Sequence, residues 1–343
     1  MSEAGVREAF EFEGSVCRQL GAPLSARLRG RLAELLDRST ATGRRVLDWP
    51  GEPLADALPV RLAAGLHALV RAGALPALAT HFPPQTSGDD AGFDAALTSA
   101  LHDERLLPWL DGAPQTNEVG RSGVLLPGML TIAAATGLPL RLFELGASAG
   151  LNLRMDAYAY RFGDRHLTPP DAPLTLCPAW EGSPPPLAPL TIIARRGVDL
   201  APVDLSDAAA RNRLLAYVWP EQVDRAVRLE AAIVAFRADP ALLDHGDAAV
   251  WVASHVTLQR GSTAVVYHSI AWQYFPATTQ AAISAHLDAL GATATVDTPL
   301  AWLRYEFDAP DAPATLRLRL WPGGGDRLLA HAHPHGASVQ WLG

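Results

Sequence analysis

Residues 140–153, with the sequence LRLFELGASAGLNL, decide the fold of this chain. The first six residues are mostly apolar and predict a short buried strand, with Glu144 near its carboxyl end. Gly146, Ser148 and Gly150 then predict a tight turn of small residues, after which a helix is expected to begin. Strand, glycine turn and helix form the first unit of a doubly wound α/β fold. In such a fold, the turn lets a ligand approach the backbone closely.

Three interpretations of this turn are open. The spacing Glu144-x-Gly146-x-Ser148-x-Gly150 resembles the first motif of class I methyltransferases, which bind S-adenosylmethionine. Residues 146–150 also fit the G-x-S-x-G nucleophile elbow of α/β-hydrolases. In the third interpretation, the glycines only allow a helix to pack closely on a strand. We take cofactor binding as the leading interpretation.

The composition is that of a globular protein without a nucleic-acid signature. The 343 residues are 49% hydrophobic, carry a net charge of −8 and contain no run of basic residues, so no nucleic-acid partner is expected. All 28 basic residues are arginine, which excludes a Schiff-base lysine and a P-loop lysine. Cys17 and Cys177 are too few for a disulfide framework or a cysteine zinc site. The N-terminus lacks a signal-peptide pattern, which predicts a cytoplasmic protein.

The distribution of apolar residues predicts two domains. Residues 1–120 contain amphipathic helical patterns separated by polar loops, and we expect a helical N-terminal domain there. Residues 121–343 alternate between strand and helix patterns, which predicts a Rossmann-like, methyltransferase-like α/β domain with a doubly wound sheet. Residues 300–307 and 314–321 predict an antiparallel hairpin added to this sheet. The uncharged segment 122–140 contains internal prolines and glycines, so we expect a buried helix and the first strand there, with no membrane span.

Two acidic residues stand where this architecture keeps its ligands, at the carboxyl ends of strands. The sequence around Asp247 resembles the segment after the third strand of many methyltransferases, where the carboxylate meets the adenine amino group. The alternative is that Asp247 caps the following helix. Asp199 is a candidate for the ribose-binding carboxylate. It is farther from the glycine turn than the usual separation of about 20 residues, so this assignment requires an inserted hairpin at 156–190.

Hydrogen-bonding side chains gather just before the first buried helix, at residues 115–121. Arg121 is a candidate to grip a carboxylate with two parallel hydrogen bonds. The alternative for this segment is helix capping with a surface ion pair. The predicted cofactor-binding residues are Arg121, Glu144, Gly146, Ser148, Gly150, Asn152, Asp199 and Asp247.

The predicted catalytic residues are His268, Ser269 and Tyr274, at and after the end of a buried strand. In the methyltransferase interpretation this strand is the fourth, whose end holds the methyl acceptor, and His268 is a candidate general base. The alternative is a hydrogen-bonded structural histidine beneath aromatic packing. Three histidines alternate near the C-terminus, at 331, 333 and 335, but they lack a carboxylate partner and read as a turn, so no metal site is predicted.

Taken together, these motifs resemble an uncharacterised bacterial family, the domain of unknown function DUF2332, over almost the whole chain. The resemblance implies a methyltransferase-like Rossmann core and no established reaction. The residues that carry it are Gln115, Asn117, Glu118, Arg121, Glu144–Leu153, Arg196, Gly197, Asp199, Pro202, Trp219, Pro220, His268, Ser269, His335, Gly336 and Trp341.

The sequence departs from methyltransferases at two points. Ser148 replaces the middle glycine of the first motif, and the Asp/Asn-Pro-Pro-aromatic tetrapeptide of many amino-directed nucleic-acid enzymes is missing. We therefore expect an S-adenosylmethionine-dependent methyltransferase that acts on a small molecule or a protein side chain. The alternatives are a serine hydrolase that uses Ser148 with Asp247 and His268, and a non-catalytic protein that binds a nucleoside-type metabolite. The sequence makes no prediction of oligomeric state.

Overall fold

A computed structural model describes residues 2–309 and 312–343, which divide into two compact units. The first unit comprises the chain up to Thr116 together with Asp207–Val227, and the second comprises Asn117–Ser206 and Arg228–Gly343. The sequence predicts two contiguous domains, residues 1–120 and 121–343. The structure differs from this prediction because the segment 207–227 belongs to the first unit. That segment lies in sequence between two strands of the second unit's sheet.

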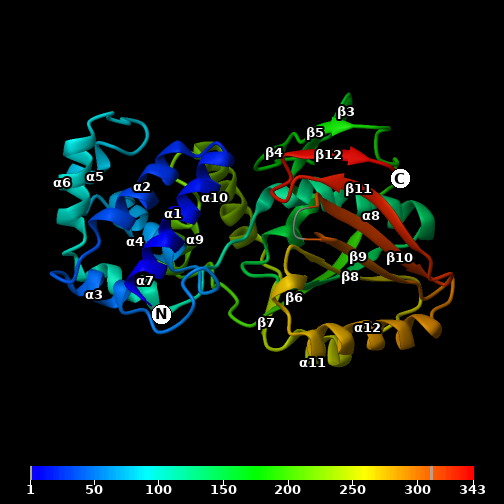
Figure 1. Ribbon diagram of the computed structural model, residues 1–343. Helices are drawn as coiled ribbons and strands as arrows, with labels where there is room; N and C mark the ends of the chain where they lie inside the picture. The colour runs from blue at the N-terminus through cyan, green and yellow to red at the C-terminus, as the bar shows by residue number, and fades with distance from the viewer. Residues whose placement is uncertain (1, 310–311) are drawn as a thin grey trace. The chain divides into compact units, whose positions relative to one another are not determined.

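Among the described residues of the first unit, every regular secondary-structure element is a helix (Figure 1). Apolar faces predicted from the sequence, such as Leu28 and Leu32 or Leu62 and Leu66, are buried in one common core. Its elements are α1 (Glu3–Gln19), α2 (Pro23–Leu35), α3 (Ala41–Leu47), α4 (Leu58–Arg71), α5 (Pro76–Ala79), α6 (Asp90–Ala100), η1 (Glu104–Leu106), α7 (Leu107–Asp111) and α9 (Ala208–Ala216). The unit boundary then falls within α10 (Val223–Ala238).

A side chain from the inserted segment caps a helix of this unit. The N-cap of α2, Ala22, supplies no side-chain hydrogen bond. Instead, the carboxylate of Glu221 accepts hydrogen bonds from the backbone N–H of Ser25 at 2.9 Å and from its hydroxyl at 2.8 Å. A carboxylate at a helix N-terminus satisfies an orphan N–H group and interacts favourably with the helix dipole. Glu221 therefore fastens the segment 207–227 to α2.

The second unit contains a mixed, mostly parallel sheet of nine strands in the order β5-β12-β11-β10-β9-β8-β1-β6-β7. The strands are β1 (Leu140–Leu145), β5 (Ala179–Glu181), β6 (Ile192–Asp199), β7 (Leu242–His245), β8 (Thr263–Ser269), β9 (Leu300–Phe307), β10 (Ala314–Trp321), β11 (Asp326–Ala332) and β12 (Ser338–Trp341). The strands β7, β6, β1, β8 and β9 are parallel. Among these five strands, chain order runs outward from β1 in both directions, so the topology reverses between β1 and β8.

Helices cover both faces of the parallel part of the sheet (Figure 1). On one face, α8 (Ser122–Thr136) packs closely on β9 and β10, because Gly128 lies against the side chains of Leu303 and Leu316. On the other face, α11 (Ala248–His255) and α12 (Ala277–Ala292) share an apolar core with β1, β8 and β9. The segment expected to be a buried helix is therefore α8. The window Val119–Thr136 is long and apolar enough to cross a membrane, yet 72% of it is buried inside the protein.

A small ribbon interrupts the path from β1 to β6. It contains β2 (Ala159–Phe162), β3 (Arg165–Leu167) and β4 (Thr175–Leu176), which form a separate three-stranded sheet. The assignment of Asp199 to the ribose required inserted structure at residues 156–190. This ribbon and β5 occupy those residues. The segment after the glycine turn is not the regular α-helix expected from the sequence. It is a 3₁₀ segment, η3 (Leu151–Ala157), with non-helical backbone at Arg154.

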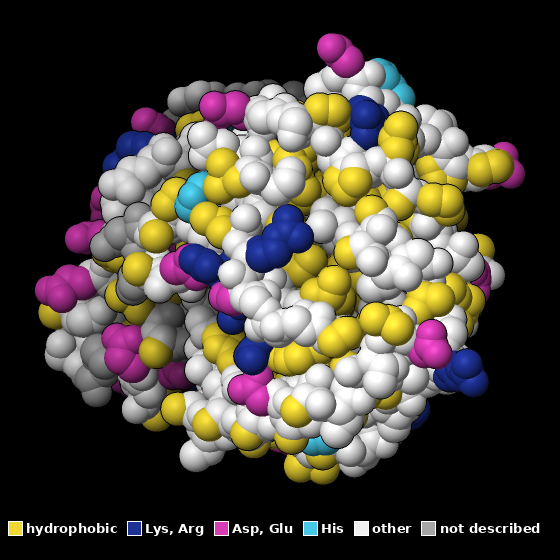
Figure 2. All heavy atoms as spheres, turned by 90° about the vertical axis from the view of Figure 1, so that its right-hand side faces the viewer, with side chains coloured by type: hydrophobic (Ala, Val, Ile, Leu, Met, Phe, Trp, Pro, Cys, Tyr) yellow, Lys and Arg dark blue, Asp and Glu magenta, His cyan; other side chains and the backbone are white. Residues whose placement is uncertain are grey.

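The predicted hairpin 300–307 and 314–321 is confirmed as β9 and β10, and β11 and β12 extend it into an antiparallel meander. Ion pairs connect neighbouring strands of this part of the sheet, such as the pair between Arg317 of β10 and Asp308, which follows β9. Figure 2 shows one face of the molecule, on which arginine side chains stand singly among apolar and acidic ones. The face drawn there has no extended basic patch.

We predict that Glu221→Ala destabilises the helical unit by about 1–3 kcal/mol, because the buried N–H of Ser25 loses a charged acceptor. Urea unfolding followed by circular dichroism measures the change. The matched control is Glu11→Ala, which removes an exposed glutamate of α1 and is expected to change stability by less than about 0.5 kcal/mol. Equal effects of the two substitutions would contradict the capping role.

Candidate functional site

The candidate site lies at the carboxyl ends of β1 and β8, where the strand order reverses. Ligands of open α/β sheets bind outside the strand ends at such a switch point. The two strands run in register, with Glu144 of β1 directly beside Tyr267 of β8. The glycine turn leaves β1 here, and the segment Ile270–Phe275 leaves β8. Both segments were singled out by the sequence as candidate ligand-binding regions.

The glycine turn is held by hydrogen bonds to the neighbouring strand. The N–H groups of Gly146 and Ala147 both donate to the carbonyl oxygen of Val198, at 2.9 and 3.0 Å. The N–H of Ser148 donates to the Asp199 carboxylate at 2.8 Å. Three alternate residues of the turn have positive φ, namely Gly146, Ser148 and Gly150. The turn is therefore a rigid structure that β6 fixes in place.

Packing within the protein explains both glycines of the motif. A Cβ at Gly146 would lie 2.7 Å from the Cβ of Ala271, and one at Gly150 would lie 2.9 Å from Leu243. Positive φ adds a second reason for glycine at both positions. This agrees with the packing interpretation of the turn, and a bound ligand is not needed to account for either glycine.

Two non-glycine residues with positive φ lie at the switch point, and three others, Ala57, Thr86 and Asp171, lie elsewhere in the described part of the chain. Ser148 has φ +51° and Ile270 has φ +48°, and each follows the end of one of the two central strands. Positive φ is especially unfavourable for a β-branched residue such as isoleucine. Strain of this kind costs of the order of 1–3 kcal/mol and tends to occur at functional sites. At Ser148 and Ile270 this strain coincides with the ends of β1 and β8.

Glu144 is an acid buried in the sheet, only 2% exposed. Burial raises the pKa of Glu144 to about 8, although a hydrogen bond from the Tyr267 hydroxyl and the charge of Arg121 act in the opposite direction. The Tyr267 hydroxyl lies 3.2 Å from Glu144 Oε2. Burial likewise raises the pKa of Tyr267 well above its usual value. At neutral pH the pair is therefore mostly uncharged.

Arg121 presents a guanidinium group that no carboxylate pairs with among the residues that the structure describes. Its Nε donates to the carbonyl oxygen of Pro334 at 3.1 Å, and its Nη1 donates to that of Ser269 at 2.8 Å. Removal from water lowers the pKa of Arg121. Within residues 2–309 and 312–343, Nη2 has no hydrogen-bond partner. An arginine fixed by carbonyl groups, with donors to spare, is suited to bind an anionic group.

Amide side chains surround the start of η3. The Asn117 side-chain oxygen accepts the N–H of Leu151 at 2.9 Å. Asn152 is buried and its side-chain oxygen accepts the Ser122 hydroxyl at 2.7 Å. These bonds connect the start of α8 to the segment that follows the glycine turn. Asn152 thus has a structural contact in addition to its predicted place in the site.

The three predicted acidic residues lie at or just beyond the carboxyl ends of adjacent strands, each two residues farther along than the one before it in the strand register. Glu144 lies near the end of β1, Asp199 ends β6, and Asp247 follows β7. The Asp199 carboxylate accepts the N–H groups of Ser148 and Ala201. Asp247 caps α11 through bonds to the N–H groups at 249 and 250, and accepts the Thr279 hydroxyl at 3.3 Å. The helix-capping interpretation of Asp247 is therefore correct, and its predicted contact with adenine stays a prediction.

His268 lies on the opposite face of β8 from Tyr267, because successive side chains alternate along a strand. It is completely buried. Its Nδ1 lies 2.6 Å from Glu306 Oε1, and its Nε2 accepts the indole N–H of Trp302 at 3.2 Å. Its ring stacks on Trp272, with centroids 4.7 Å apart. Both nitrogens are thus engaged, and this geometry favours a structural histidine over a general base.

The other two predicted catalytic residues lie closer to Arg121. The backbone carbonyl of Ser269 binds the guanidinium, and Ser269 is only 7% exposed. Tyr274 is 75% exposed in η4 (Trp272–Tyr274). The hydrolase triad Ser148–Asp247–His268 is not assembled, because His268 bonds to Glu306 and Asp247 caps a helix. Sequence reasoning missed Glu306, since a lone acidic residue in a hairpin strand gives no signal.

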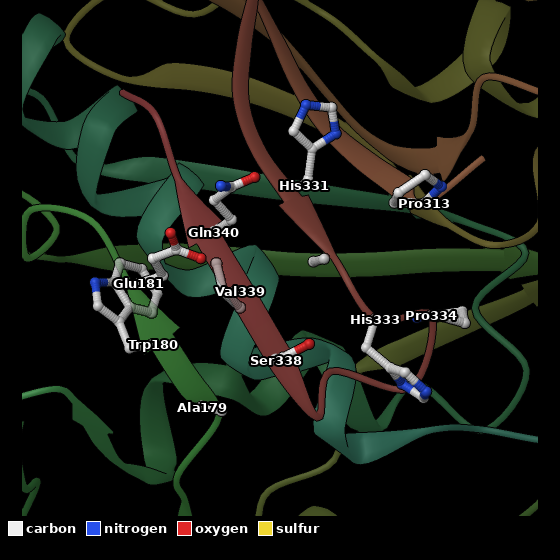
Figure 3. Close-up of a pocket in the computed structure, with 11 residues that line it drawn as sticks. Ala179, Trp180, Glu181, Pro313, His331, His333, Pro334, Ser338, Val339 and Gln340 are labelled. Atoms are coloured by element: carbon white, nitrogen blue, oxygen red, sulfur yellow. The ribbon is translucent and has the colours of Figure 1, made fainter. Parts of the chain in front are cut away.

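A groove of about 470 Å³ lies over β5, β12 and β11, and its lining includes Pro334, whose carbonyl oxygen binds Arg121 (Figure 3). Strand register places Glu181, Gln340 and His331 side by side across it. His333 and Pro334 border its other end. No group of three or more His, Cys, Asp or Glu side chains suited to a metal ion occurs among residues 2–309 and 312–343.

Comparison with known protein families gives one match of nearly full length. Residues 7–341 match the model of the family described as an uncharacterized protein conserved in bacteria, DUF2332. The chain belongs to this family. Comparisons with curated proteins and with solved structures gave no significant match. Membership of DUF2332 thus agrees with the resemblance inferred from the motifs, and the family description assigns no activity.

The buried acid gives a prediction about pH. The pKa of Glu144 is raised from 4.5 to about 8 in the folded protein, so the folded state retains a proton that the unfolded state releases. The contribution of Glu144 to stability is therefore greatest below pH 4.5 and decreases as the pH rises towards 8, by up to about 1.4 kcal/mol per pH unit. We predict that Glu144→Gln removes this component and makes the protein relatively more stable at pH 8–9. Denaturant midpoints measured from pH 5 to 9 test it.

The control for this measurement is Glu181→Gln, which changes an exposed glutamate of the same sheet. Its stability profile is expected to run parallel to that of the unmodified protein. If Glu144→Gln also runs parallel, Glu144 is ionised in the folded protein and its described environment is wrong.

Proposed function

We propose that this protein binds S-adenosylmethionine at the carboxyl ends of β6, β1 and β8 and transfers its methyl group to a small molecule or a protein side chain. The observation that carries the proposal is the placement of Glu144, Asp199 and Asp247 at the ends of β1, β6 and β7. In methyltransferases, which the first motif resembles, acidic residues after the first three strands serve the amino group, the ribose and the adenine. The strand order supplies the matching arrangement.

The side chains at this edge suit the chemical groups of the cofactor. Arg121 Nη2 has no hydrogen-bond partner in the described part of the chain and suits a carboxylate, and Glu144 suits the adjacent ammonium group. Asp199 suits the ribose hydroxyls and Asp247 the adenine amino group. Both carboxylates already accept backbone hydrogen bonds, but a carboxylate has about four acceptor positions. The present hydrogen bonds orient the two carboxylates and leave acceptor positions for a ligand.

When bound, the cofactor supplies a sulfonium whose methyl group is already activated for attack. The protein's contribution is then alignment of the acceptor for in-line transfer. The rigid glycine turn and the strained segment after β8 provide fixed walls for this purpose. The exposed hydroxyl of Tyr274 stands on that segment and is our candidate for contact with the acceptor.

A non-catalytic ligand-binding protein is the second candidate, and one observation favours it. His268, the only histidine predicted to act as a base, has both nitrogens occupied within the fold. A binding protein needs no base. The two candidates share the cofactor site and differ in turnover, so binding is measured first and methyl transfer to candidate acceptors second.

We predict that the protein binds S-adenosylmethionine and S-adenosylhomocysteine, and that Arg121→Met weakens both by about tenfold or more in Kd. The reason is that a buried hydrogen bond to a charged group contributes about 1.5–3 kcal/mol. Because Glu144 is protonated at pH 7, an ammonium group beside it favours its ionised form and binding releases protons. Isothermal titration calorimetry in two buffers of different ionisation enthalpy measures both quantities.

The control is Arg317→Met, which removes an arginine paired with Asp308 at a distance from the glycine turn in sequence and sheet order. Its affinity is expected to equal that of the unmodified protein. Folded, unmodified protein that binds neither compound at millimolar concentration would refute the proposed function.

A further inference from the structure

The segment after β8, Ile270–Phe275, packs against the glycine turn of the candidate site. Its residue Ala271 lies against Gly146 of the glycine turn. The carbonyl oxygen just before it, on Ser269, holds the Arg121 guanidinium at 2.8 Å. The position of this segment therefore sets both the space beside the glycine turn and the direction of Arg121. What holds the segment in place decides the geometry of the site.

One carboxylate oxygen holds this segment. Glu306 Oε1 accepts the N–H of Ala271 at 3.0 Å and that of Trp272 at 3.2 Å. The same oxygen lies 2.6 Å from Nδ1 of His268. Glu306 belongs to β9, which is parallel to β8 and pairs Tyr305 with Ser269. It therefore reaches past the end of β8 to the turn from a neighbouring, rigid strand.

The hydrogen bonds assign the tautomer of the His268 ring. The indole N–H of Trp302 is only a donor, so Nε2 of His268 accepts it at 3.2 Å. The proton of neutral imidazole is then on Nδ1, which donates to Glu306. The ring stacks on Trp272 with an interplanar angle of 15°. His268 thus connects Glu306 to the indole of the segment that Glu306 holds.

The strain at Ile270 shows that the segment requires such a restraint. Its φ of +48° is unfavourable for an isoleucine and persists only where the surroundings fix it. The N–H of Ile270 donates to the Tyr305 carbonyl at 2.8 Å, and Glu306 holds the next two residues. Consecutive residues of β9 therefore restrain the three residues that follow β8.

We propose that Glu306 is a positioning residue of the cofactor site. It acts through the segment 270–275, keeping Ala271 against the glycine turn and the Ser269 carbonyl on Arg121. The ligand in this inference rests on the proposed function. The restraint itself is a property of the fold that is measurable without a ligand.

The test compares three substitutions at Glu306. Glu306→Ala removes the acceptor, Glu306→Asp withdraws it by one methylene while keeping the charge, and Glu306→Gln keeps an acceptor oxygen at the same reach. We expect the Ala and Asp variants to bind S-adenosylhomocysteine about tenfold more weakly by calorimetry, and the Gln variant to remain within about threefold of the unmodified protein. Rescue by glutamine separates positioning from a need for charge. Glu181→Ala, on the same sheet, is the matched control.

Amide hydrogen exchange provides the second readout. The N–H groups of Ala271 and Trp272 are expected to exchange at least about tenfold faster in the Ala and Asp variants than in the Gln variant. Unchanged exchange in both the Ala and Asp variants overturns the inference, and so does unchanged affinity in a protein that binds the ligand. If the unmodified protein binds no ligand but exchange accelerates as expected, the proposed function fails while the restraint by Glu306 stands. If the Ala variant does not fold, the Asp and Gln variants decide the result.

Discussion

The parallel pairing of β1 between β6 and β8 is the constraint on which the rest of the second unit depends. It brings three strand ends to one edge of the sheet. It also allows the glycine turn to bond to Val198 and Asp199 of β6 on one side. On the other side, it places the turn against Ala271 after β8. Without this pairing, the acidic residues at 144, 199 and 247 would be unrelated positions along the chain.

The two-residue alternation of β8 divides its polar groups between two roles. Tyr267 and the buried acid Glu144 lie together on one face, where burial keeps them mostly uncharged at neutral pH. His268 lies on the other face and bonds to Glu306 and Trp302. The Glu144 side of the strand end therefore lies within reach of the charge of Arg121. The His268 side contacts Glu306, which holds the segment 270–275. Tyr267 and His268 are adjacent in the sequence, but they contact different parts of the structure.

The glycine motif combines packing with strain. Gly146 and Gly150 are required by neighbouring side chains and by their positive φ, so their presence alone is weak support for a ligand. Ser148 and Ile270 carry a stronger indication, because neither residue type favours positive φ and both follow central strands. The fold compensates for this strain with backbone N–H groups that donate to oxygens of Asp199, Tyr305 and Glu306.

The sequence by itself determined the local elements. The apolar run at 140–145, the turn at 146–150 and the alternation at 300–307 and 314–321 each specify a structure within a few residues, because periodicity and turn chemistry are local. An insertion before Asp199 was a condition of assigning it to the ribose, and the structure has β2, β3 and β4 there. The tertiary structure alone decided that residues 207–227 join the helical unit, that His268 is enclosed, and that Glu306 holds the segment after β8. These depend on contacts between residues distant in the chain, such as His268 with Glu306, which no local pattern records.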